Sequence, residues 1–137
     1  MQRKILIASH GKLAGGMLDT LSLFFQNNGN ITMMCSYTQE GNNIEKEIER
    51  YMKMVQDEEV IIFTDMMGGS VNSLFLPYLG KKNIHLIAGF NLPLILEFVC
   101  LPEEKLEKEK IHEVIEKTRM SMLYVNDCAV SFSEDDE

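Results

Sequence analysis

Short apolar runs alternate with helix-like stripes along this chain. The run Lys4–Ser9 is almost wholly apolar, which is typical of a strand covered on both faces. Between Leu13 and Gln26, apolar side chains recur at helical spacing and would share one face of a helix. The pattern therefore predicts a strand followed by an amphipathic helix. The residues of the helical stripe are Ala14, Leu18, Leu21 and Phe25.

The same alternation continues over the rest of the chain. Apolar runs predict further strands at 31–37, 59–64 and 84–88. Helical spacing of apolar side chains predicts further helices at 44–55, 71–79 and 102–118. Met122 to Val125 could form a last strand. Such alternation predicts an α/β fold: an open, mostly parallel sheet with helices on both faces and right-handed crossovers.

Several residues mark where these elements begin or break. Residues 40–43, Glu-Gly-Asn-Asn, are expected to make a turn and an N-cap before the second helix. Pro77 should kink or shorten the helix that contains it. Asn91 is expected to cap a short helix, in whose first turn the missing N–H of Pro93 costs little.

The composition fits one globular domain spanning residues 1–137. Of the 137 residues, 45% are hydrophobic and 25% are charged, and the net charge is -8. An acidic protein repels phosphate groups, so we expect no nucleic acid or anionic membrane as partner. The acidic tail 133–137 is expected to be a disordered, solvated terminus.

The sequence indicates neither membrane insertion nor a metal site. No apolar run approaches the ~20 residues of a membrane span, and the apolar stretch after the basic N-terminus is too short for a signal peptide. We therefore expect a cytoplasmic protein. The three cysteines, Cys35, Cys100 and Cys128, lack paired spacing and are typical of reduced thiols. The histidines and cysteines also lack metal-ligand spacing, and we expect no metal and no cofactor.

Chemically useful side chains follow the first and third predicted strands. His10 ends the first strand, and Asp65 comes directly after the third. Open parallel sheets bind ligands at the carboxyl ends of strands, where the strand order reverses. If these two strands are neighbours, His10 and Asp65 emerge side by side. A carboxylate that holds one imidazole N–H fixes the tautomer and supports the charge that develops when the other nitrogen attacks.

Small residues surround this pair. Gly68, Gly69 and Ser70 precede a predicted helix, and Gly11 leads into the first one. Glycines permit backbone conformations that expose N–H groups, and a serine here can cap the helix or donate to a phosphoryl oxygen. A phosphoryl group on His10 could thus rest between two helix N-termini. Each residue alone also fits an ordinary packing, turn or capping role, but their coincidence at one sheet edge favours a functional site.

Three motifs at the strand ends make the chain resemble a known family. They are Ser9–Ala14 (SHGKLA), Thr64–Ser70 (TDMMGGS) and Gly89–Glu97 (GFNLPLILE). Over nearly its whole length, the chain resembles the IIA domain of the mannose family of the bacterial sugar phosphotransferase system. The resemblance implies four parallel strands plus a C-terminal antiparallel strand. Met122 to Val125 is the candidate for that last strand, which better-known members exchange across a homodimer.

The resemblance also implies a phosphocarrier function. His10 would be the nucleophile that takes phosphate from the histidine-containing phosphocarrier protein, and Asp65 would orient it. Ser70 and the backbone of Gly68 and Gly69 would contact the phosphoryl oxygens. The acceptor would be a IIB protein that serves a membrane permease. Because no fused IIB domain follows, we expect that acceptor to be a separate protein, and this chain does not reveal the sugar.

The loop after Asp65 departs from the family pattern. Met66-Met67 stand where the family usually has a leucine and a bulky aromatic residue. Val71 and Ser73 replace the usual proline and asparagine, while Asn72 lies one position early. These differences bear on contacts with partners and secondary contacts with phosphate, not on the chemistry of the histidine and its carboxylate.

The proposed carrier needs a shallow site, because donor and acceptor must both reach the phosphoryl group. We expect His10 on the floor of a depression that two partners contact in turn, weakly and transiently. Exposed methionines suit such a surface because they adapt to different partners. The residues expected around His10 are Met66, Met67, Phe90, Asn91 and Leu92.

Three other functions share parts of this pattern. The phosphotransfer subunit of a dihydroxyacetone kinase shares the fold and the histidine, although Asn91-Leu92-Pro93 favours the sugar-transport IIA. A response-regulator receiver is phosphorylated on an aspartate in the place of Asp65, but it needs an acidic pair where this chain has Ser9-His10. A flavodoxin-like flavin binder needs a Ser/Thr-rich phosphate loop, which Gly11–Gly16 does not provide.

Overall fold

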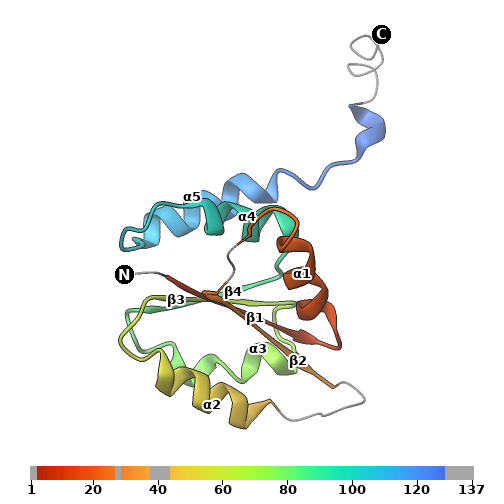
Figure 1. Cartoon of the computed structure of the whole chain (residues 1–137). Helices are drawn as coiled ribbons and strands as arrows, with labels where there is room; N and C mark the ends of the chain where they lie inside the picture. Colours follow the sequence, from red (N-terminus) through yellow and green to blue (C-terminus); the bar gives the residue numbers. More distant parts are fainter. Residues whose placement is uncertain (1–2, 27–28, 38–43, 129–137) are drawn as a thin grey trace.

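Four parallel strands form a sheet at the centre of the molecule (Figure 1). The computed structural model describes residues 3–26, 29–37 and 44–128. Along the sheet the strands lie in the order β2-β1-β3-β4, and every neighbouring pair is parallel. The predicted α/β class with a mostly parallel sheet is therefore confirmed. The strands are β1 (Lys4–His10), β2 (Ile31–Ser36), β3 (Val60–Thr64) and β4 (Ile84–Ala88).

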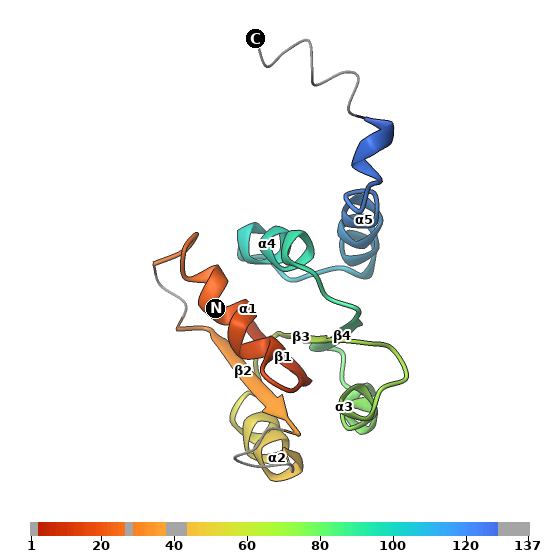
Figure 2. The same ribbon diagram turned by 90° about the vertical axis from the view of Figure 1, so that its right-hand side faces the viewer.

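Helices cover both faces of this sheet (Figures 1 and 2). One face carries α1 (Leu13–Leu21), α4 (Leu92–Cys100) and α5 (Lys108–Arg119). The other face carries α2 (Glu45–Met54) and the short α3 (Ser70–Ser73). Two 3₁₀ turns complete the elements of the described residues, η1 (Leu76–Tyr78) after α3 and η2 (Val125–Asp127) after α5.

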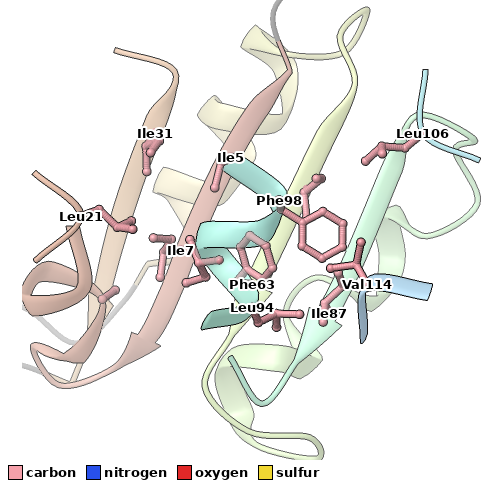
Figure 3. Packing of buried hydrophobic residues seen from close by; sticks show 13 residues of the cluster. Ile5, Ile7, Leu21, Ile31, Phe63, Ile87, Leu94, Phe98, Leu106 and Val114 are labelled. Carbon is pink, nitrogen blue, oxygen red and sulfur yellow. The ribbon is translucent and has the colours of Figure 1, made fainter. Parts of the chain in front are cut away.

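The strands build a hydrophobic core on each face of the sheet. Successive side chains of a strand point to opposite faces. Ile5 and Ile7 of β1 pack with Phe63 beneath α1, α4 and α5 (Figure 3). Leu6 of β1 and Ile62 of β3 belong to the core on the α2 side. Because both faces are buried, the strands read as continuous apolar runs, and the sheet forms a rigid support for the loops at its ends.

The strand order reverses between β1 and β3. From β1 the chain passes through α1 to β2 on one side, and then returns through α2 to β3 on the other side. The carboxyl ends of β1 and β3 therefore border the crevice in which such sheets bind ligands. His10 is the last residue of β1, and Asp65 is the first residue after β3.

The predicted elements are present, but several of their ends differ. The strand at 84–88 matches β4, whereas the first helix ends at Leu21 instead of Gln26. The helix expected at 71–79 is divided into α3 and η1, which agrees with the break expected at Pro77. The Asn91 cap is confirmed, since its Oδ1 accepts a hydrogen bond from the Leu94 N–H at 2.9 Å.

The last helix begins at Lys108, six residues after its predicted start at Pro102. The guanidinium of Arg3 donates to the carbonyl oxygens of Pro102 and Glu104 at 3.0 and 2.7 Å. Arg3 also forms an ion pair with Glu59 at 3.2 Å. These long-range bonds hold the segment before Lys108 against the amino ends of the strands, outside any helix.

The strand predicted at Met122 to Val125 is not formed in the single chain. Residues 122–124 have no regular secondary structure, and Val125 opens η2. Figures 1 and 2 show the chain leading away from the sheet after α5, and this segment pairs with no described strand of its own chain. The turn at 40–43 and the acidic tail 133–137 lie outside the described residues. Among the described helices, none has the length and apolar character of a membrane span.

Candidate functional site

His10 and Asp65 meet where β1 and β3 end. Asp65 Oδ2 lies 2.9 Å from the ring Nδ1 of His10 and accepts a second hydrogen bond, from the His10 main-chain N–H, at 2.8 Å. One carboxylate oxygen thus fixes both the backbone and the ring of the histidine. The structure brings together the two side chains that the sequence pattern paired.

Ser70 lies at the second nitrogen of the same ring, with its Oγ 3.1 Å from His10 Nε2. An ionised carboxylate can only accept hydrogen bonds, so the proton of the neutral ring resides on Nδ1, facing Asp65. The Ser70 hydroxyl then donates to the Nε2 electron pair. With 36% of the His10 side chain exposed, that electron pair is within reach of a molecule approaching from solvent.

The carboxyl of Asp65 is adapted to this role. Burial alone raises the pKa of Asp65, but hydrogen bonds from the His10 main chain and ring, with the charge of the protonated ring, outweigh burial and lower it below its ordinary value. Its other oxygen, Oδ1, is buried and has no hydrogen-bond partner within the described part of the chain. Asp65 is therefore ionised at neutral pH, and its hydrogen bonding is directed to His10.

Glycines shape the loops on both sides of the imidazole. Gly11 (φ +57°) and Gly68 (φ +77°) adopt the left-handed conformation that favours glycine. At Gly69, a Cβ would lie 3.1 Å from Cε1 of His10, so a side chain there would crowd the ring. The N–H of Gly11 donates to the Ser36 carbonyl at 2.6 Å. Gly11 therefore makes the turn after the histidine, and its N–H is already engaged within the protein.

A buried hydrogen bond fixes the loop between β3 and α3. The Thr64 hydroxyl donates to Asn72 Oδ1 at 2.7 Å, and both residues are buried. This bond joins the residue before Asp65 to the helix that begins with Ser70. The two groups that contact the imidazole are thereby positioned relative to each other. Asn72, which lies one place early against the family pattern, makes this contact.

The expected apolar surroundings of His10 are only partly on the surface. Met66 and Met67 are 55% and 79% exposed. Phe90 and Leu92 are half-buried and pack against the core beneath α4. Asn91 is engaged as the cap of α4. The exposed apolar surface in the loop after β3 is thus formed by the two methionines.

Two residues have roles here that the sequence pattern did not reveal. Tyr37 stacks on His10 with ring centroids 5.6 Å apart and planes inclined by 12°. Ser9 accepts a hydrogen bond from the Ala14 N–H at 2.7 Å and so fixes the start of α1 against β1. Tyr37 directly follows β2, the strand beside β1. This position at a neighbouring strand end is the one sequence signal that points to it.

The fold and the site together define a class of protein. It is an α/β protein with an oriented, exposed histidine at the switch point of a parallel sheet, which suits nucleophilic attack and group transfer at a surface. The sequence profile of the phosphotransferase system fructose IIA component, EIIA-man, matches residues 4–118. The chain belongs to this family, and it is therefore a IIA component of a sugar phosphotransferase system.

Relatives agree with this membership. Over 98 residues the chain is 31% identical to the sorbose-specific EIIA component of the phosphotransferase system of Klebsiella pneumoniae, covering 69% of this chain and 70% of that protein. A crystal structure of a phosphoenolpyruvate-dependent sugar phosphotransferase system permease from Klebsiella pneumoniae subsp. pneumoniae is similar, with a TM-score of 0.85 and 30% identity. The similarity covers 94% of this chain and 95% of that one.

The same fold occurs in the phosphotransferase system IIA protein associated with the fucose utilization operon of Streptococcus pneumoniae. Its crystal structure matches with a TM-score of 0.75 and 28% identity, covering 94% of this chain and 97% of that one. The family assignment thus agrees in sequence and in three dimensions.

Proposed function

We propose that His10 accepts a phosphoryl group on Nε2 and passes it to a second protein. One observation carries this proposal: Nδ1 is committed to Asp65, so the electron pair of Nε2 faces Ser70 and the exterior. Family membership supports a phosphotransfer role. We propose the histidine-containing phosphocarrier protein as the donor and a IIB protein, serving a membrane permease, as the acceptor.

The transfer exchanges one P–N bond for another. The Nε2 electron pair of His10 forms a bond to phosphorus while the P–N bond of the donor phosphohistidine breaks, and the donor imidazole keeps the bonding electrons. The proton on Nδ1 stays in place. The positive charge gained by the His10 ring then lies beside the Asp65 carboxylate, which favours the phosphorylated state. In the onward transfer the roles are reversed. The P–N bond of phosphorylated His10 breaks, the His10 ring keeps the bonding electrons, and the acceptor forms the new bond to phosphorus.

The phosphoryl oxygens would be held from the α3 side. The Ser70 hydroxyl, 3.1 Å from Nε2, can turn from the nitrogen to a phosphoryl oxygen once the P–N bond has formed. The main chain at Gly68 and Gly69 would supply further N–H donors, and the Gly69 N–H would exchange its long bond to the Met66 carbonyl, 3.4 Å, for a phosphoryl oxygen. The Gly11 N–H is held more closely, at 2.6 Å from the Ser36 carbonyl, and its loop is a structural support in this proposal.

The exposed Met66 and Met67 are proposed to contact the two partners in turn. Both lie in the loop between Asp65 and the glycines, so a protein that reaches the histidine also meets them. Polarisable, flexible side chains accommodate different partner surfaces without tight binding. Since the donor is met in every cycle, we place the protein in the cytoplasm with it.

We also propose that the protein forms a homodimer through its C-terminal segment. Large apolar side chains after α5 are between 62% and 81% exposed in the single chain, which is unusual for a monomer. Beside the free edge of β4 lies a groove of about 560 Å³. Met122 to Val125 of a second copy could add a strand along this edge. The exposed residues are Met120, Met122, Leu123, Tyr124 and Val125.

Phosphate transfer from labelled phosphoenolpyruvate through the general phosphotransferase enzymes tests the main proposal. We expect acid-labile, base-stable label on the wild-type chain, none on His10→Ala, and undiminished label on the matched control His112→Ala, whose imidazole is exposed on α5. Label that persists without His10, or its absence from the wild type, would contradict the assignment.

A further inference from the structure

We propose that Tyr37 is a positioning residue for this transfer, and that its ring stabilises the phosphorylated form of His10. The inference rests on the proposed phosphorylation of His10, but it is drawn from a separate observation. Tyr37 lies directly after β2 and stacks on the imidazole, with centroids 5.6 Å apart and planes inclined by 12°. This distance and near-parallel arrangement are typical of offset stacking.

Tyr37 supplies the kind of contact that the other neighbours of His10 lack. Asp65 and Ser70 bond to ring nitrogens at the edge of the imidazole, and the space that a Cβ at Gly69 would fill adjoins Cε1, also at the edge. Hydrogen bonds at the edge fix the direction of the nitrogens but resist tilting of the ring plane only weakly. A flat ring against the face restricts that tilt, and so fixes the line along which Nε2 meets phosphorus.

The backbone of Tyr37 is held in an unfavourable conformation. Its φ is +58°, in the left-handed region that bulky residues rarely adopt, and within the described residues it is the one non-glycine with positive φ. The preceding Ser36 pairs with His10 in the β1–β2 register, and its carbonyl accepts the Gly11 N–H at 2.6 Å. These bonds tie the end of β2 to the turn after the histidine. Strain kept beside a reacting group points to a functional role.

The stack favours the phosphorylated histidine for an electrostatic reason. When Nε2 carries the phosphoryl group and Nδ1 keeps its proton, the imidazole ring itself is cationic. The face of a tyrosine attracts a cation that lies within about 6 Å of its centroid. Tyr37 therefore complements the Asp65 carboxylate: the carboxylate acts at the ring edge, and the aromatic ring acts on its face.

Two variants of the full chain separate the ring from the backbone. Tyr37→Gly removes the ring and relieves the positive φ, so it should unfold at or above the wild-type temperature. Tyr37→Phe keeps the ring and removes only the hydroxyl. The first readout is the chemical shift of the His10 ring protons in the unphosphorylated protein. The second is the fraction of phosphohistidine at equilibrium with the phosphorylated donor protein.

We expect Tyr37→Gly to move the His10 ring protons downfield and to lower the equilibrium constant for phosphorylation by about two- to tenfold, while Tyr37→Phe matches the wild type. A Tyr37→Gly protein phosphorylated to the wild-type extent would overturn the inference and leave the proposed function intact. A wild-type chain that takes no label from the donor would overturn both. A Tyr37→Phe protein as impaired as Tyr37→Gly would assign the effect to the hydroxyl and overturn the role of the ring.

Discussion

At the scale of residues, one carboxylate oxygen organises the site. Asp65 Oδ2 accepts from both the ring and the main chain of His10. The residue types at two strand ends were sufficient to predict that pair, because parallel strands bring their carboxyl ends to one edge. The second bond, to the main chain, could not be predicted, since it depends on how the chain bends after each strand. The same holds for the engaged N–H of Gly11.

Asp65 also makes the fold sensitive to acid. Its pKa lies below the ordinary value of 3.8, so its hydrogen bonds to His10 contribute fully to stability above that pH. The contribution is lost as the pH falls through the lowered pKa. We expect the free energy of unfolding of the wild type, relative to that of Asp65→Asn, to shrink as the pH falls below 3.8. Urea denaturation over a pH series measures this, and a difference that grows with acidification would contradict it.

At the scale of elements, periodicity located the strands and helices well but misplaced their ends. Continuous apolar runs identified β1 and β3 because those strands are covered on both faces. The last helix was predicted to start at Pro102, since its stripe of apolar residues includes the buried Leu106. Hydrogen bonds from Arg3 hold this segment out of the helix. They join residues about one hundred positions apart in the sequence, so no local pattern predicts them.

Capping was more predictable, because it depends on a few adjacent residues. Replacing Asn91 by alanine removes the acceptor for the Leu94 N–H and should lower the free energy of unfolding by about 1 kcal/mol. Asn91→Asp keeps a capping oxygen and is the matched control. Urea denaturation of both variants measures the loss. Equal stability of the alanine variant and the wild type would show that the cap contributes nothing.

At the scale of the whole molecule, the alternation of elements predicts the sheet and its switch point. It does not predict where the C-terminal segment packs. An apolar stretch of four residues reads as a strand whether its partner edge belongs to its own chain or to another. In the single chain, residues 122–124 remain unpaired with the sheet. In the proposed dimer this segment packs against a second molecule. The position of that molecule cannot be read from the sequence of one chain.

The proposed dimer gives this segment its partner. Sedimentation equilibrium should yield a mass twice the 15.7 kDa of one chain. Replacing Leu123 and Tyr124 by aspartate should shift the protein toward monomer, since charges at a sheet edge oppose pairing. The matched control is Leu23→Asp, because Leu23 is 84% exposed but lies near the end of α1. A monomeric wild type, or a dimer that survives the double substitution, would contradict the proposal.

The most direct test of the central claim identifies which nitrogen of His10 carries phosphorus. Long-range ¹H–¹⁵N correlation spectra of the phosphorylated full chain distinguish the two ring nitrogens. The geometry predicts phosphorus on Nε2, with the proton retained on Nδ1 opposite Asp65. Phosphorus on Nδ1, or on any other residue, would contradict the account of this site.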